Sequence, residues 1–212
     1  MEYKTTREEV KMRNILIGIL ALLIGCAAGN AFAEDLAGRF SVGIAGGGIF
    51  PKDSDIDDTY YVGGNFAYGI NEYFAIGAEA GYTSWDDEEA GVDYGEVEAI
   101  PLLADLYLRR PVEVGENILV PYVVGGVGVI FWDYEESDLL TSNAITVDMD
   151  AELGVKAGGG FDYFFTENSA INIEGAYIWS DADMSVAAFG LYGAATIDTD
   201  YWLATGGFKH YF

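Results

Sequence analysis

The fold is decided by residues Ile145–Tyr163, which read ITVDMDAELGVKAGGGFDY. Apolar, aromatic or small residues occupy the odd-numbered positions of this stretch, and polar residues or glycine occupy the even-numbered ones. A period of two places successive side chains on opposite faces of a β-strand. On a helix, apolar positions would instead recur about every 3.6 residues, which is one turn. The stretch therefore predicts a long β-strand with one apolar face and one polar face.

Seven other stretches have strand-like lengths and largely the same alternation. They are Arg39–Phe50, Tyr60–Ile70, Tyr73–Thr83, Val97–Arg109, Ile118–Trp132, Ala170–Trp179 and Tyr201–Phe212. The stretch Ile118–Trp132 is apolar or glycine on both faces, so its pattern does not show which face points inward. Pro101 cannot donate a ladder hydrogen bond, so we expect a bulge at that position.

The first 33 residues are expected to be a signal peptide, followed by a barrel domain over residues 34–212. The true start is expected at Met12, because a short charged segment and the apolar core Ile15–Ala28 follow it. Ala31-Phe32-Ala33 is a small-x-small cleavage site. The apolar core is shorter than the roughly 20 residues that a membrane-spanning helix needs.

Cys26 leaves a second interpretation of this leader open. The residues Leu23-Ile24-Gly25-Cys26 resemble a lipoprotein cleavage box, in which Cys26 would carry a lipid. Cleavage after Ala33 is favoured, because a closed barrel needs no lipid anchor. That cleavage would also remove the only cysteine of the chain, which excludes disulfides and thiol chemistry from the mature protein.

The leader and the strands together predict an eight-stranded antiparallel up-and-down transmembrane β-barrel in a Gram-negative outer membrane. In lipid every backbone polar group must be paired within the protein, so a spanning sheet has to close. The connections after the second, fourth and sixth strands are short, namely Asn71-Glu72, Pro111–Asn117 and Thr166–Ser169. Short periplasmic turns and longer external loops are typical of such barrels.

Aromatic residues gather near both ends of the expected strands. Those near the outer loops are Tyr82, Trp85, Phe131, Trp132, Tyr177 and Trp179. Those near the inner turns are Phe74, Tyr122, Phe161, Tyr163, Phe208 and Phe212. Amphipathic rings favour membrane interfaces, so we expect these residues to form two interfacial belts. The alternative is that they are core residues of a soluble barrel or sandwich.

The chain is strongly acidic, with a formal net charge of −25 at pH 7. Nucleic acid is excluded as a partner, because phosphates are bound by Lys and Arg. Acidic residues crowd three expected outer loops, as Asp53, Asp55, Asp57, Asp58, Asp86, Asp87, Glu88, Glu89, Asp93, Asp133, Glu135, Glu136 and Asp138. Divalent cations bind such oxygens and bridge lipopolysaccharide, so we expect contact with outer-membrane lipid and lipopolysaccharide. Specific calcium binding stays open, but solvated surface charge is favoured over it, because the first loop lacks the glycine and terminal glutamate of an EF-hand. The fourth loop, Met184–Ala195, is apolar and glycine-rich instead.

Charged residues on the inward faces predict a cluster inside the barrel. These residues are Glu79, Asp105, Lys156, Glu174, Arg109 and Lys209. Counted from the periplasmic turns, Glu79, Asp105, Lys156 and Glu174 lie at similar middle heights. A buried carboxylate needs a partner, so we expect ion pairs with Lys156 at the centre. The cluster is either a gate that rearranges or a static plug in an interior that eight strands leave narrow.

The sequence gives little support for an enzyme activity. The only histidine is His210, with no serine near it in sequence. One histidine and no mature cysteine make a transition-metal site improbable. We therefore expect no catalytic, metal or cofactor-binding site.

Three segments resemble the small eight-stranded outer-membrane barrels, and among them the OmpW family. They are the run into Pro51-Lys52-Asp53, the segment PYVVGGVG at Pro121–Gly128, and Gly154–Asn172, which contains GGFDYFFT at Gly159–Thr166. These motifs are shared with the OmpA-type and OmpX-type barrels. The terminal Phe212, with Phe208, resembles the signal read by the outer-membrane assembly machinery.

The resemblance implies a porin-like, narrow route for small and mainly hydrophobic molecules, with such a solute as a partner. The charges expected in the lumen leave a second function open, namely a closed structural or adhesive barrel that transports nothing. A continuous lumen would support the first function, and a lumen sealed around Lys156 would support the second.

Overall fold

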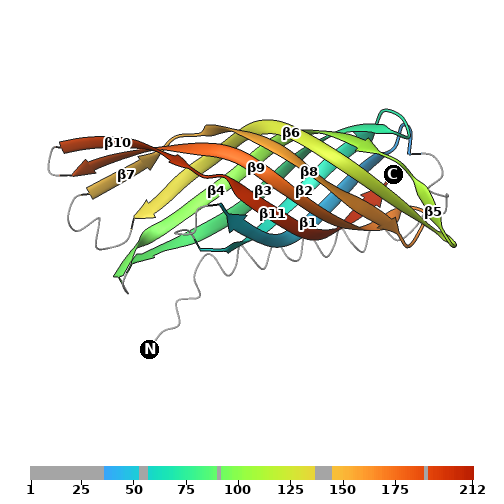
Figure 1. The fold of residues 1–212 in the computed structure, drawn as a ribbon, viewed down its shortest axis with the longest axis horizontal. Helices are drawn as coiled ribbons and strands as arrows, with labels where there is room; N and C mark the ends of the chain where they lie inside the picture. The colour runs from blue at the N-terminus through green and yellow to red at the C-terminus, as the bar shows by residue number, and fades with distance from the viewer. Residues whose placement is uncertain (1–35, 53–56, 90–91, 137–144, 189–190) are drawn as a thin grey trace, which may run out of the picture. The chain divides into compact units, whose positions relative to one another are not determined.

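The computed structural model describes residues 36–52, 57–89, 92–136, 145–188 and 191–212, most of which lie in strands (Figure 1). The strands are β1 (Phe40–Pro51), β2 (Thr59–Gly69), β3 (Phe74–Glu89), β4 (Val92–Arg109), β5 (Val112–Val114), β6 (Asn117–Glu136), β7 (Ile145–Met149), β8 (Glu152–Phe164), β9 (Ser169–Ala188), β10 (Leu191–Asp198) and β11 (Tyr201–Tyr211). No helix among the described residues is long and apolar enough to cross a membrane. The expected signal peptide, with Cys26, lies outside these residues, as do Asp53, Asp55 and Asp138.

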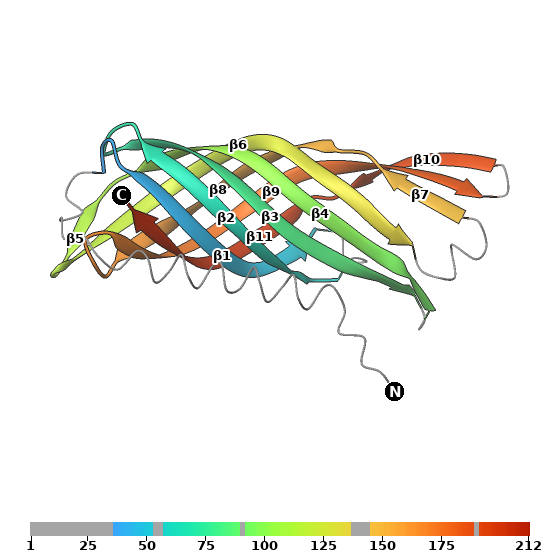
Figure 2. The same cartoon turned by 180° about the vertical axis from the view of Figure 1, so that it is seen from behind.

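The strands close on themselves because β1 pairs with β2 along one edge and with β11 along the other. The remaining neighbours follow as β2–β3–β4–β6–β8–β9–β11, and every pair is antiparallel. β7 and β10 prolong the wall on the two sides of β9, and β5 pairs with the start of β6. The described residues therefore form a closed barrel of eight antiparallel strands, which confirms the predicted fold class. Figure 2 shows the face made by β1 to β4.

The two ends of the barrel differ in the length of their connections. Figure 1 places the C-terminal residue near β5, and β7 and β10 at the opposite end. At that opposite end β6 and β9 continue, since each holds 20 residues, about twice what one crossing needs. Short turns face the periplasm in such barrels. We therefore call the end with the C-terminus the periplasmic end and the other the outer end.

Parts of three segments expected as outer loops belong to strands instead. The acidic residues 86–89 lie in β3, and Asp133 lies in β6. The apolar segment Met184–Ala195 lies mostly in β9 and β10, which pair as a hairpin. The loop assignments were wrong because composition was used as the signal, whereas backbone pairing decides where a hairpin ends.

The long stretch Ile145–Tyr163 is interrupted between β7 and β8. Met149 pairs with Met184, but Gly154 pairs with Ser180, so this side carries one residue more than β9. An extra residue of this kind is a bulge, and it exchanges the two faces of a strand. Met149 packs against the inner apolar cluster, whereas Leu153 faces outward with 63% of its surface exposed. The prediction of one unbroken apolar face was therefore wrong at its outer end.

The expected bulge at Pro101 is absent. Pro101 pairs with Ile130 and Leu102 pairs with Val129 in one continuous register. Between β3 and β4 the register shifts at Asp87 and Glu88 instead. The missing donor of Pro101 therefore removes a hydrogen bond without displacing the strand.

The inner face of the barrel changes character along its length. On β9 the inward residues run from Ala182 and Ile178 at the outer end, through Glu174 and Asn172, to Ala170 near the periplasm. The first two belong to one apolar cluster and the last to another. Large apolar side chains that remain exposed, such as those of Leu102 or Trp202, cover the outside, as expected of a lipid-facing wall.

A candidate site in the lumen

Lys156 projects from β8 into the middle of the barrel, and its side chain is fully buried. Its Nζ atom lies 2.7 Å from Glu79 Oε2, 3.1 Å from Asp105 Oδ2 and 3.2 Å from Glu174 Oε1. An ammonium group has three N–H donors and no acceptor. One lysine can therefore serve one carboxylate from each of β3, β4 and β9. We call these four residues the Lys156 cluster.

Each carboxylate of the cluster also receives a tyrosine hydroxyl. The pairs are Tyr61 with Glu79 at 2.9 Å, Tyr107 with Asp105 at 3.1 Å, and Tyr122 with Glu174 at 2.8 Å. Burying a carboxylate is costly unless donors replace water, so the tyrosines help to stabilise the charges. None was predicted in this role, and Tyr122 was wrongly placed at the inner membrane interface. Its inward direction could not be derived because both faces of β6 are apolar or glycine.

The Lys156 cluster contains three carboxyl groups and one ammonium group. Asp105 Oδ1 is buried and has no hydrogen-bond partner among the described residues. A side chain at Gly126 would overlap this oxygen, because a Cβ atom there would fall on it. Gly126 thus provides the space that the Asp105 carboxylate occupies.

A second polar group lies on the periplasmic side of the Lys156 cluster, around Asp162. The Asp162 carboxylate accepts hydrogen bonds from Tyr211 at 2.6 Å and from Asn172 at 2.7 Å, and Lys209 lies 3.1 Å away. Asn172 also donates to Tyr122, which joins the two groups. Asp162 was not predicted as a site residue, although it follows Lys156 on the polar face of the same strand.

The structure does not bring Arg109 and Lys209 into the Lys156 cluster. Both face inward and are buried, but Lys209 pairs with Asp162. Arg109 donates to the carbonyl oxygens of Leu36 and Asn71 at the periplasmic end. The six-residue cluster was therefore wrong for these two residues. Arg109 lies four residues beyond Asp105 on β4, about 13 Å at 3.3 Å per residue, which is too far for a shared contact.

An apolar cluster fills the lumen on the outer side of Lys156. We call it the outer apolar cluster; it comprises Ile49, Tyr61, Ala99, Ile130, Trp132, Ile178, Ala182, Tyr201 and Leu203, with Trp85, Val97 and Met149 packed against them. The rings of Trp85 and Trp132 stack with centroids 6.0 Å apart. Both indole N–H groups are buried without a partner among the described residues. The prediction that these two tryptophans lie in an interfacial belt was wrong, because their strand positions point inward.

The two residues of the expected assembly signal lie on the outside of the barrel. Phe212 stacks on Phe40 with ring centroids 5.3 Å apart, and its backbone N–H donates to the Phe40 carbonyl. Phe208 lies beside Phe165, with centroids 6.1 Å apart. Their recognition by the assembly machinery stays a prediction.

The structure places a serine beside the only histidine. Ser169 Oγ lies 3.2 Å from His210 Nδ1, across the pairing of β9 with β11. No carboxylate among the described residues is hydrogen-bonded to His210, so this pair lacks the third member of a hydrolytic triad. Nor do the described residues contain a group of three or more His, Cys, Asp or Glu side chains arranged to hold a metal ion.

Comparison with known proteins agrees with this architecture. Residues 18–200 match the family model described as "Outer membrane protein beta-barrel domain". OprG from Pseudomonas aeruginosa is 18% identical over 86% of this chain and 99% of that chain, with a TM-score of 0.73. No curated protein matches the chain.

Two further solved structures are similar at lower TM-scores. AlkL in lipid bilayers is 16% identical, with 88% of this chain and 94% of that chain covered and a TM-score of 0.55. The outer membrane protein W of E. coli is 17% identical, with 83% and 98% covered and a TM-score of 0.53. At these identities the structural matches show the fold alone.

Proposed function

Because this chain belongs to the outer membrane protein beta-barrel domain family and lies in the bacterial outer membrane, we propose that it is a narrow route for small, mainly apolar molecules. The molecule binds first at the outer apolar cluster. The Lys156 cluster below it keeps the lumen from acting as an open, water-filled pore.

The two free indole donors carry this proposal. Trp85 and Trp132 belong to the outer apolar cluster, and neither N–H has a partner among the described residues. A buried donor without an acceptor is unfavourable by about 1–3 kcal/mol. An apolar molecule with one oxygen acceptor would satisfy such a donor while its apolar part replaces or rearranges the surrounding side chains. Small-ligand sites in proteins are likewise mostly apolar, with a few polar groups that orient the ligand.

The resemblance to the OmpW family implies the same class of solute. A charged middle section agrees with a route that excludes ions and water-soluble solutes, because the Lys156 side chain is fully buried among its carboxylates. The molecule must therefore either displace this cluster or leave the lumen before reaching it.

A closed structural barrel is the second candidate. The observation that favours it is the filled middle of the lumen, where Glu79, Asp105 and Glu174 are all at least nine-tenths buried around Lys156. Under this function the outer apolar cluster would be packing only, and no molecule would bind there at a saturable site.

The four tryptophans allow a direct test. Trp179 and Trp202 face lipid, and Trp85 and Trp132 lie in the outer apolar cluster. The Trp179→Phe/Trp202→Phe double variant therefore fluoresces from the lumen alone. Bromine quenches tryptophan on contact, so a brominated medium-chain alcohol, which is apolar with one oxygen, is titrated into this variant in lipid vesicles.

The route predicts quenching that saturates at low alcohol concentration. The Ala99→Phe change, made in the double variant, adds a ring inside the outer apolar cluster and should abolish the saturable part. Quenching that rises in proportion to the alcohol in the membrane, alike with and without Ala99→Phe, would leave only the closed structural barrel.

A further inference from the structure

Leu36 fills the periplasmic end of the lumen, although it belongs to no strand. It precedes β1, which begins at Phe40, and its side chain is fully buried in an apolar cluster. We call this the periplasmic apolar cluster; its other members are Val120, Phe164, Ala170 and Tyr211, with Ile118 packed against them. Residues 36–38 therefore form a short strap outside the sheet, with Leu36 as its inward-pointing tip.

Two hydrogen bonds hold the strap in place. Gly38 adopts a positive φ of 75°, and its N–H donates to Gly69 O at 2.7 Å. The Leu36 carbonyl accepts a hydrogen bond of 3.1 Å from the Arg109 guanidinium inside the barrel. Gly69 leaves the room for this contact, because a Cβ atom there would overlap both Leu36 O and Arg109 Nη2. The wall of the barrel therefore fits the strap both at its turn and at its tip.

The residue after the strap is fixed to the barrel by its side chain. Arg39 Nη2 donates to Asn168 Oδ1 at 2.7 Å and to the Tyr211 carbonyl at 3.1 Å. The Arg39 guanidinium also lies over the Tyr211 ring, 5.7 Å from its centroid. Because Arg39 is held in this way, a movement of the strap has to turn at Gly38. Glycine is the residue that changes its backbone conformation at the lowest steric cost.

The closed strap leaves a buried charge without an ion pair. Arg109 is 8% exposed, and no carboxylate of the described residues lies within ion-pair distance of it. Its Nε atom is buried and makes no hydrogen bond within that part of the chain. A buried charge that is not paired is unfavourable. Opening the strap would admit water to Arg109, which offsets part of the cost of exposing Leu36, so the two forms lie closer in free energy than burial of a leucine alone implies.

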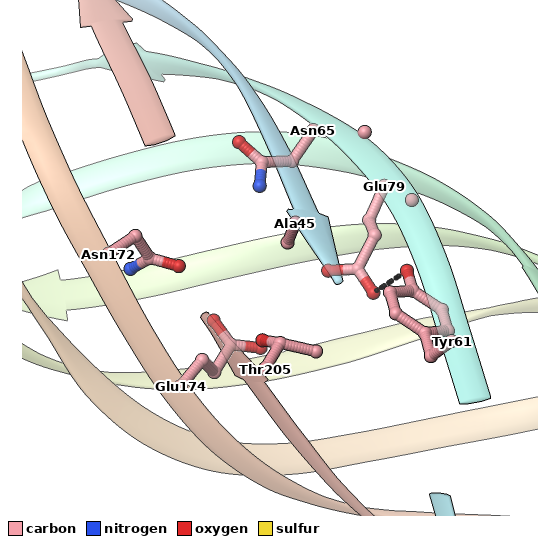
Figure 3. Close-up of a pocket in the computed structure, with 9 residues that line it drawn as sticks. Ala45, Tyr61, Asn65, Glu79, Asn172, Glu174 and Thr205 are labelled. Carbon is pink, nitrogen blue, oxygen red and sulfur yellow. Dashed lines mark hydrogen bonds between the residues drawn. The ribbon is translucent and has the colours of Figure 1, made fainter. Parts of the chain in front are cut away.

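The middle of the lumen stays closed whatever the strap does. Beside the Lys156 cluster lies a small cavity, which Tyr61, Glu79 and Glu174 help to line (Figure 3). The centre of a water-sized particle can occupy only ≈ 10 Å³ of it, and about 10–15 Å³ by this measure is needed to hold one water molecule. An open strap would therefore expose the periplasmic part of the lumen, as far as the Lys156 cluster.

From these contacts we propose that residues 36–38 are a movable strap that opens and closes the periplasmic end of the lumen, with Gly38 as its hinge. In the closed form Leu36 fills the periplasmic apolar cluster and Arg109 holds its carbonyl. In the open form this cluster faces the periplasm. Cleavage after Ala33, which the sequence leads us to expect, would leave two residues ahead of Leu36 and make the strap a short free end.

The strap goes beyond the proposed route, because it concerns the end of the lumen opposite the outer apolar cluster. It does not depend on which solute binds in that cluster, and a closed structural barrel would have it equally. The alcohol quenching test is therefore read separately from the experiment on the strap.

Cysteine labelling can follow the strap, because the chain has a single cysteine, Cys26, which Cys26→Ser removes. In that background Leu36→Cys places a thiol on the buried tip of the strap, and Ala37→Cys places one on its exposed side. Both proteins are purified from outer membranes in detergent and treated with a water-soluble maleimide. The proposal predicts slow labelling of Leu36→Cys and fast labelling of Ala37→Cys.

Gly38→Ala is the variant that tests the hinge. No atom lies within 4 Å of a Cβ at this position, so the methyl group strains the left-handed backbone without a clash and disfavours the closed form. Labelling of Leu36→Cys should become about five- to thirtyfold faster, which corresponds to the cost of a left-handed conformation for a residue with a Cβ atom. Gly38→Asn should raise the rate less, because Asn tolerates this conformation.

Two buried alanines show how far the opening reaches. Ala170 lies in the periplasmic apolar cluster, and Ala182 lies in the outer apolar cluster beyond Lys156. Gly38→Ala should speed the labelling of Ala170→Cys and leave Ala182→Cys protected.

Three results would overturn the proposal. Equal labelling of Leu36→Cys with and without Gly38→Ala would make Leu36 a fixed plug. Labelling of Leu36→Cys as fast as that of Ala37→Cys would mean that Leu36 does not close the lumen. Faster labelling of both Ala170→Cys and Ala182→Cys in Gly38→Ala would mean that the whole barrel loosens and that the strap does not move by itself.

Discussion

Asp105 and Lys156 lie on strands separated by β6, yet their side chains form a 3.1 Å ion pair over Gly126. Gly126 is the residue of β6 that is paired with both of them, with Asp105 on one side and with Lys156 on the other. A glycine at this position therefore lets the two charges meet across an intervening strand.

Replacing Gly126 with alanine should destabilise the barrel. The new Cβ atom would overlap Asp105 Oδ1, and overpacking of this kind typically lowers the free energy of unfolding by about 1–3 kcal/mol. Gly125→Ala is the matched control, because a Cβ atom there is 4.0 Å from its nearest neighbour, Lys156 O. Urea unfolding in lipid vesicles measures both. Equal stabilities of the two variants would show that Gly126 is not needed for the ion pair.

Lys156→Met should be more damaging. The change leaves Glu79, Asp105 and Glu174 without their shared cation, and breaking a buried ion pair from one side costs about 3–5 kcal/mol. Lys52→Met serves as the control, since Lys52 is 54% exposed in its own ion pairs and should contribute less than about 1 kcal/mol. A Lys156→Met barrel that unfolds at the same urea concentration as the Lys52→Met control would rule out the charge cluster as a stabilising element.

The stabilising contribution of Asp198 at the outer end should be lost in acid. Lys52 Nζ lies 2.8 Å from Asp198 Oδ2, and this hydrogen bond, with a second one from the Asp200 backbone N–H, holds the pKa of Asp198 below its ordinary value. The ionised carboxylate therefore favours the folded state above the pKa of the unfolded chain, and this contribution is lost as pH falls below about 4.

The comparison of wild type with Asp198→Asn measures that contribution. The difference in unfolding midpoint should shrink between pH 6 and pH 3, and also in about 1 M salt, because the pair is exposed and screened. A difference that grows on acidification would have the opposite sign and would contradict the assigned pair.

Phe212 is expected to act in assembly rather than in stability. Phe212→Ala should lower the amount of barrel inserted in cells while refolding into detergent stays normal. Phe40→Ala is the control, because it removes the same ring stack at 5.3 Å and keeps the terminal aromatic. Phe208→Ala should resemble Phe212→Ala. If Phe40→Ala reduces insertion in cells as strongly as Phe212→Ala does, the ring stack is what insertion requires, and the assembly-signal prediction is wrong.

Alternation along single strands was enough to predict much of this barrel. The polar face that contains Lys156 and the inward positions of Glu79 and Glu174 follow from a period of two, and counting from the short turns put them at one height. The middle of the lumen could be assembled in this way because each of these residues lies on a strand with a clear apolar face.

The wrong predictions concern how strands lie relative to one another, which the sequence of a single strand does not show. Contacts across the lumen follow from the stagger between strands, so the tyrosine donors and the separation of Lys209 from Lys156 could not be derived. The two faces of β6 look alike, which hid the inward direction of Trp132. The bulge after Met149 exchanges the inward and outward faces of the strand, and no proline or glycine at residues 150–152 indicates it.

The central claim is that the Lys156 cluster keeps the barrel from being an open pore, and current recordings of the wild-type protein in a planar bilayer test it most directly. Insertion is first confirmed by the different migration of unboiled and boiled samples on SDS gels. The account predicts a correctly inserted barrel that shows no discrete conductance steps. Regular steps carried by simple salt ions would contradict it, because they require a continuous aqueous path past Lys156.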